Sequence, residues 1–197
     1  MKNIILGAIG VVVLLVVIMI ASHINNVPKL DEGVKAAWGQ VDNQYKRRAD
    51  LIPNLVATVK GYASHEKEVL TEVTEARAKV GQMNVSSDML NDPNTLAQFE
   101  ANQGALSSAL SRLMVVVERY PELKADKNFQ ALQSQLEGTE NRIAVARKDY
   151  IAAVKKYNIE LRTVPGRWVA AIFYPEAEIK ESFKATPQEQ ATPKVEF

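Results

Sequence analysis

The fold is decided by residues 34–80, which read VKAAWGQVDNQYKRRADLIPNLVATVKGYASHEKEVLTEVTEARAKV. Apolar and aromatic side chains recur there at steps that are nearly all three, four or seven, at Val34, Trp38, Val41, Tyr45, Ile52, Leu55, Val56, Val59, Tyr62, Ala63, Val69, Leu70, Val73, Ala76 and Val80. Such steps place one apolar stripe along one side of a helix. The stripe keeps its phase across Pro53, where a proline is expected to stop or kink a helix. We therefore expect one long helix bent near residues 51–53, or two helices meeting there, carrying the buried seam of a helical bundle.

The rest of the chain predicts further amphipathic helices with short connections. Asp92-Pro93 is a good helix start, because Asp caps a helix and Pro fits its first turn, and this helix is expected to end before Pro121. Asp126 is expected to cap another long helix. A turn at Thr163-Val-Pro-Gly166 leads into an apolar patch, residues 168–174, that we expect to close the end of the bundle.

An unbroken apolar run from Ile4 to Ala21 precedes these helices. Eighteen helical residues span ~27 Å, close to the ~30 Å hydrocarbon core of a bilayer. A cleaved signal peptide is the alternative, but cleavage after Ala21 would put Met19 at the −3 position, which is poor for a small-residue site. We expect a retained anchor in contact with membrane lipids.

These features predict an all-α chain with one transmembrane helix followed by an antiparallel up-and-down helical bundle. If Pro53 divides the first stripe, the bundle is of the four-helix type. The expected parts are a short tail at 1–3, the anchor at 4–22, a short breaker at 23–29, the bundle at 30–185 and a disordered tail at 186–197.

Two features of the sequence bear on the side of the membrane on which the bundle lies. Lys29 and Lys35 after the apolar run outnumber Lys2 before it, which favours a cytoplasmic bundle. The order of Lys2, apolar run and small residue Ala21 resembles a signal sequence and favours the other side. We expect a single-pass protein of the bacterial cytoplasmic membrane with its bundle outside the cytoplasm.

Charge and cysteine content exclude several classes of function. The formal net charge is +1, and Lys2 is the only charged side chain before Lys29, so the remainder is neutral. A neutral domain gives no electrostatic basis for binding nucleic acid. The absence of cysteine excludes disulfides, thiolate metal sites and cysteine nucleophiles.

One segment has an order that neither helix propensity nor amphipathicity demands, Arg47-Arg-Ala-Asp-Leu-Ile-Pro-Asn-Leu-Val56. Together with WGQVDNQY at 38–45, VKGYASHE at 59–66, Glu75-Ala-Arg77 and the carboxy-terminal PGRW, IFYP and Phe183, it resembles the LemA family of bacterial membrane-anchored proteins. The resemblance covers roughly residues 30–185. It implies a four-helix bundle and a retained amino-terminal hydrophobic segment, and it brings no agreed biochemical activity. Residues of these motifs expected to be structural are Trp38, Arg47, Arg48, Asp50, Pro53, Asn54 and Tyr62.

The basic run Lys46-Arg47-Arg48 is the one candidate contact site for a partner or lipid headgroups. Asp42 and Asp50 each lie four residues from Lys46, so ion pairs within the helix are the simpler interpretation.

No catalytic, cofactor or metal site is expected. His65, beside Glu66 and Glu68 on the first long helix, does not supply the converging ligands of a zinc site. No spacing singles out a pair of carboxylates, and Ser107, Ser108 and Ser111 lack the context of a nucleophile.

The sequence therefore predicts a self-assembling membrane-anchored scaffold or adaptor without catalytic activity, forming homo-oligomers. Membrane shaping is an alternative. An envelope-stress accessory role beside a membrane protease is another, because the family resemblance implies association with a membrane zinc protease in some lineages and includes a magnetosome-membrane relative. An envelope hydrolase is a third.

Overall fold

A computed structural model describes residues 2–83, 86 and 90–183. Within these residues the secondary structure is helical, with no strand, so the expected all-α class is confirmed. The helices of the described residues are α1 (Lys2–His23), α2 (Asn26–Tyr62), α3 (Lys67–Gln82), α4 (Pro93–Val117), α5 (Pro121–Ala125), α6 (Lys127–Arg162) and α7 (Gly166–Phe173).

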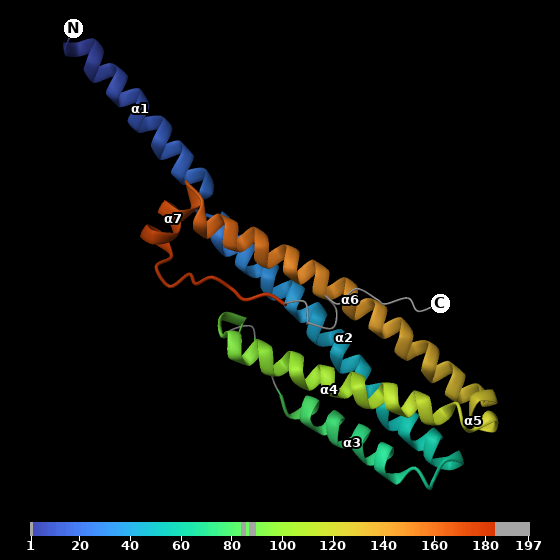
Figure 1. Ribbon diagram of the computed structural model, residues 1–197. Coiled ribbons are helices and arrows are strands. Elements are labelled where there is room, and N and C mark those ends of the chain that lie inside the picture. The colour runs from blue at the N-terminus through green and yellow to red at the C-terminus, as the bar shows by residue number, and fades with distance from the viewer. Residues whose placement is uncertain (1, 84–85, 87–89, 184–197) are drawn as a thin grey trace, which may run out of the picture.

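Helix α2 connects the other helices to one another. It packs along α6 and along α3, and α3 packs along α4. Figure 1 shows α1 projecting beyond the other helices, with the short α5 joining α4 to α6 at the end far from α1. Helix α7 lies at the opposite end, where α1 meets α2, and it contacts α1, α2 and α6.

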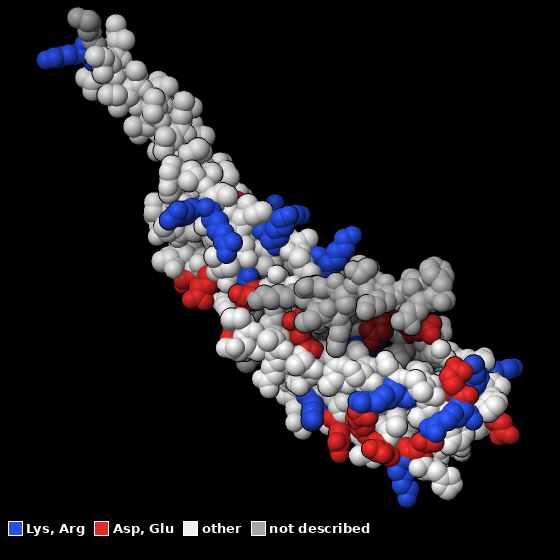
Figure 2. Space-filling view, in the orientation of Figure 1, with Lys and Arg blue, Asp and Glu red and all other residues white. Residues whose placement is uncertain are grey.

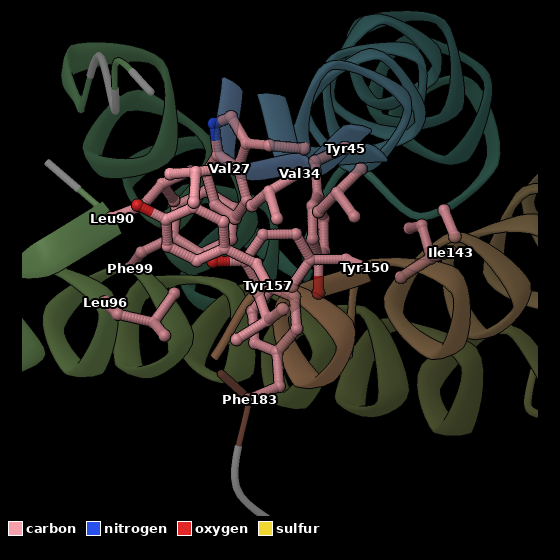
Figure 3. Close-up of a cluster of buried hydrophobic side chains, with 14 of the residues drawn as sticks. Val27, Val34, Tyr45, Leu90, Leu96, Phe99, Ile143, Tyr150, Tyr157 and Phe183 are labelled. Carbon is pink, nitrogen blue, oxygen red and sulfur yellow. The ribbon is translucent and has the colours of Figure 1, made fainter. Parts of the chain in front are cut away.

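Buried apolar side chains form two clusters along α2. The near cluster, closer to α1, joins Trp38 and Tyr45 of α2 to Phe99 of α4 and Tyr150 of α6. Figure 3 shows these helices and the carboxy-terminal segment, through Phe183, supplying side chains to one cluster. The far cluster joins Ile52, Leu55 and Val59 of α2 to side chains of α3, α4, α5 and α6. Each fully buried aliphatic side chain contributes ~1.5–3 kcal/mol, so the two clusters are the main source of stability.

Of the two alternatives at Pro53, one helix running through it or two helices meeting there, the structure has the single helix. Helix α2 continues through Pro53 to Tyr62, and the chain turns at residues 63–66 instead. His65 therefore lies in a turn rather than on a helix. The stripe hides this turn because Val59, before it, and Leu70, after it, are both buried in the far cluster.

The breaker expected at 23–29 is shorter than predicted, because only Ile24 and Asn25 separate α1 from α2. Pro28 lies in the first turn of α2, where a missing backbone N–H breaks no helical hydrogen bond. The predicted tail at 186–197 lies outside the described residues.

Two expected helix starts are confirmed by their caps. The Asp92 carboxylate accepts hydrogen bonds from the backbone N–H groups of Asn94 and Thr95 at the start of α4. The Asp126 carboxylate accepts the backbone N–H of Phe129 at 2.8 Å at the start of α6. This backbone hydrogen bond, with one from the Tyr62 hydroxyl, lowers the pKa of Asp126.

Residues 174–183 run from α7 back along the bundle (Figure 1). The hydroxyl of Tyr150 donates to the Glu181 carbonyl at 2.8 Å, and the Glu181 N–H donates to the Leu90 carbonyl at 3.0 Å. Phe183 then packs against Trp38 and Tyr150. The carboxy-terminal segment is therefore part of the near cluster.

Replacing Leu106 by alanine tests the far cluster, since this side chain is fully buried on α4. We expect Leu106→Ala to lower the free energy of unfolding by about 2–5 kcal/mol through the cavity it leaves. Gln98→Ala on the same helix removes an exposed side chain and should change stability by less than about 0.5 kcal/mol. Chemical denaturation of the full-length protein in mild detergent measures both, and equal effects would contradict this packing.

Candidate functional site

Helix α1 has no buried side chain and is long and apolar enough to cross a membrane. Figure 2 shows it as a projecting rod whose surface is uncharged apart from lysine at the tip. Apolar side chains exposed all round a helix are stable in lipid and unfavourable in water.

The end of α1 is joined to the end of α6. His23 Nδ1 lies 3.1 Å from a carboxylate oxygen of Glu160, and the Asn26 amide lies 3.0 Å from the same ring nitrogen. Gly166 begins α7 directly against this group, because a Cβ at Gly166 would lie 2.3 Å from the Glu160 carbonyl oxygen. Only glycine fits this approach, so α1, α2, α6 and α7 meet at one compact junction.

A layer of polar side chains lies between the near and far clusters. At its centre is Arg48 of α2, which is only 2% exposed. Its guanidinium donates to Glu140 Oε1 at 2.7 Å, to Ser107 Oγ at 3.0 Å and to the side-chain and backbone oxygens of Gln103. The buried Thr139 completes the layer from α6. One side chain of α2 thus connects α4 and α6.

The layer occupies core positions on three helices. Each polar side chain of the layer lies between two buried apolar side chains of its own helix. These neighbours are Tyr45 and Ile52 for Arg48, Phe99 and Leu106 for Gln103, and Leu136 and Ile143 for Thr139. Burying a guanidinium is unfavourable unless its donors are paired, and removing its partners leaves a buried charge. The layer therefore fixes which residues of α2, α4 and α6 face one another.

This position corrects the expected basic patch. Arg48 is buried and is not a surface contact for a partner or lipid, whereas Lys46 and Arg47 are exposed. Lys46 forms the expected ion pair with Asp42 at 2.6 Å. No ion pair of Asp50 occurs among the described residues, so the second expected pair is not observed.

The proline in α2 has a structural counterpart on α3. Proline lacks the N–H that would bond the carbonyl four residues earlier, which here belongs to Ala49. Arg77 of α3 donates its Nε–H to that carbonyl at 3.0 Å. An orphaned acceptor of α2 is thereby satisfied from α3, which explains how the helix continues through Pro53.

The other motif residues lie at helix contacts or on the surface. Trp38 packs edge-on against Phe99 and Tyr150, with ring centroids 5.3 and 5.4 Å apart. The Tyr62 hydroxyl donates to Asp126 at 3.0 Å, which raises the pKa of Tyr62 and joins the end of α2 to the start of α6. Asn54 is exposed, and its backbone carbonyl accepts the Thr58 hydroxyl.

Two grooves flank Tyr45. A groove of about 530 Å³ lies between α2, α3 and α4 beside Asp50 and Arg77, and one of about 480 Å³ lies between α2, α4 and α6 beside Arg48 and Glu140. Burial raises the pKa of the Tyr45 phenol, against the opposing effect of Arg147 and Arg48, so its hydroxyl is neutral at pH 7. Neither groove is lined by a histidine among the described residues.

A family model described as LemA family matches residues 37–197. The chain belongs to the LemA family. The resemblance based on the motifs around Arg47 and Pro165 is therefore confirmed. Because the described residues include a helix long and apolar enough to cross a membrane, it is a membrane-associated member of that family.

Similar proteins include two named for the magnetosome. Magnetosome protein MamQ 2 of Paramagnetospirillum magneticum is 26% identical over 164 residues, 75% of this chain and 60% of that protein. Magnetosome protein MamQ of Magnetospirillum gryphiswaldense is 24% identical over 157 residues, 72% of this chain and 58% of that protein. Protein LemA of Metamycoplasma hominis is 25% identical over 118 residues, 60% of this chain and half of that protein. The chain spans less than two thirds of each relative's length.

The buried layer predicts different costs for adjacent arginines. We expect Arg48→Ala to lower the free energy of unfolding by about 3 kcal/mol or more, because it opens a cavity and leaves buried Gln103 without its donor. Glu140→Gln should cost about 1 kcal/mol or less, since Glu140 is 45% exposed and glutamine still accepts a hydrogen bond. Arg47→Ala is the matched control and should be neutral. Equal costs for Arg47→Ala and Arg48→Ala would contradict the layer.

Pro53 and Arg77 should be energetically coupled. In the wild type, Arg77→Met leaves the Ala49 carbonyl without a donor, whereas in a Pro53→Ala background the new N–H satisfies it. We expect the cost of Arg77→Met to be smaller by about 1 kcal/mol in that background. A double-mutant cycle of unfolding free energies measures this difference, and additive costs would rule out the compensation.

Proposed function

We propose that this chain is a single-pass scaffold or adaptor of the bacterial cytoplasmic membrane that self-assembles and has no catalytic activity. The observation that carries the proposal is the junction, where α1 leads into α2 through two residues and His23 bonds Glu160. A helix held in lipid by residues 4–22 would then hold the bundle in one orientation at the membrane surface. A fixed orientation allows repeated copies to present the same face to each other or to a partner.

Exposed aliphatic side chains on the bundle support self-assembly. Val115 on α4 is 69% exposed and Val145 on α6 is 59% exposed. Contact with another copy would remove such side chains from water. The names of the MamQ relatives place them in a cellular structure, the magnetosome, and state no reaction. We place the bundle outside the cytoplasm as part of the proposal, on the signal-like order of Lys2, the apolar run and Ala21.

The test is the size of the full-length protein in mild detergent, measured by light scattering and electron microscopy. We expect a discrete assembly of several copies. Val115→Glu or Val145→Glu should shift it towards smaller species, while Asn128→Glu, which adds the same charge at an exposed polar site, should not. A strict monomer that retains no partner reproducibly would contradict the proposal.

Membrane shaping is a second candidate, favoured by the exposed apolar side chains of α7 next to α1. It predicts that the purified protein alone deforms liposomes. Liposomes that stay spherical under electron microscopy would count against it. Partnership with a membrane protease stays a proposal that rests on the family resemblance.

A further inference from the structure

Helix α7 exposes apolar side chains although it is packed against the bundle. Its inner side is formed by Gly166, Val169 and Ala170, which are buried. Outside, Trp168 is 49% exposed and Ile172 is 66% exposed, one helical turn apart. Val164 before the helix and Phe173 at its end are about half exposed and extend this apolar surface, which we call the α7 face.

The level of the α7 face along the molecule is set by α1. Helix α7 contacts α1, and Gly166 abuts Glu160, the residue that bonds His23 at the end of α1. The apolar run that ends at Ala21 spans ~27 Å, so a bilayer that holds it has its headgroup boundary next to His23. The α7 face therefore lies beside the point at which α1 leaves the hydrocarbon core (Figure 1).

We propose that α7 is an interfacial membrane helix, whose Val164, Trp168, Ile172 and Phe173 side chains enter the boundary between acyl chains and headgroups. The inference rests on the anchoring of α1 in a membrane that the proposed function assumes. Tryptophan is enriched at that depth because its ring is apolar and its N–H is polar. Arg162 lies before the turn into α7 and Arg167 lies after it, and both are exposed. At this depth their side chains reach lipid phosphates.

Lipid is the occupant that the geometry favours. A bilayer surrounds α1 wherever protein does not, and α7 adjoins the exit point together with α2 and the end of α6. Another copy or a different protein would have to displace headgroups to cover the α7 face. With α1 crossing the bilayer and α7 lying on it, two contacts of different direction fix the tilt of the bundle.

The chain carries its own probe. It has two tryptophans, Trp38 buried at 3% exposure in the near cluster and Trp168 on the α7 face. The full-length protein is reconstituted into phosphatidylcholine and phosphatidylglycerol liposomes with brominated acyl chains, which quench tryptophan in contact with lipid. We expect loss of most Trp168 emission, strongest for bromines near the headgroups. Trp168→Phe should abolish the quenchable component and leave only Trp38.

Matched variants separate lipid contact from other causes. Ile172→Glu should lower the quenching several-fold, while Asn128→Glu, at an exposed site of α6 away from α1, should leave it unchanged. If Trp168 is not quenched and emits as tryptophan does in water, the inference is overturned. If Trp168 is not quenched but its emission is shifted to the blue, the inference is also overturned, and the α7 face is covered by protein instead of lipid. Flotation with the liposomes tests α1 separately. Protein that floats without quenching leaves the anchor intact, and protein that does not float ends both proposals.

Discussion

The structure depends on one constraint on α2. This helix must continue from the membrane helix α1 and also supply side chains to the core. Helix α2 follows α1 after two residues and supplies buried side chains along its whole length, from Val27 to Val59. Helices α3 and α6 pack on it directly, and α4 packs on α3. Because these helices are ordered relative to α2, they are ordered relative to α1, and the hydrogen bonds of His23 and Asn26 with Glu160 hold the join from the other side. The orientation of the bundle is then a property of the fold rather than of a flexible linker.

Polar contacts select one alignment of the helices, because burial of apolar side chains alone would allow several. Two apolar clusters would accept several alignments of α4 and α6 against α2, since Leu, Val and Phe pack well in many registers. Arg48 is compatible with one alignment, in which oxygens of Gln103, Ser107 and Glu140 accept hydrogen bonds from its guanidinium. Arg77 acts similarly between α3 and α2, where it supplies the hydrogen bond that Pro53 removes from Ala49. Both arginines lie in the sequence motifs by which the chain resembles the LemA family, and their contacts give those motifs a structural role.

The sequence predicted the parts that depend on local periodicity and capping. The all-α class, the apolar first helix and the starts at Asp92 and Asp126 follow from side-chain spacing and from carboxylates that cap backbone N–H groups. The turn at 63–66 was not predicted, because α2 and α3 on either side of it pack against the same far cluster. The apolar stripe therefore does not change phase at the turn. Arg48 could have been found, since it fills the empty core position in a step of seven, but its charge suggested the surface. The partners of Arg48 and Arg77 lie on other helices, and no pattern in one helix reveals them.

The central claim, that anchor and bundle move as one body, is tested most directly by a distance distribution across the junction. The chain has no cysteine, so spin labels placed at Val12 on α1 and Lys148 on α6 report on these two sites alone. Double electron–electron resonance on labelled full-length protein, diluted with excess unlabelled protein in lipid nanodiscs so that only distances within one copy are measured, should give one narrow distance distribution. A broad distribution, like that of two bodies joined by a flexible linker, would contradict the account.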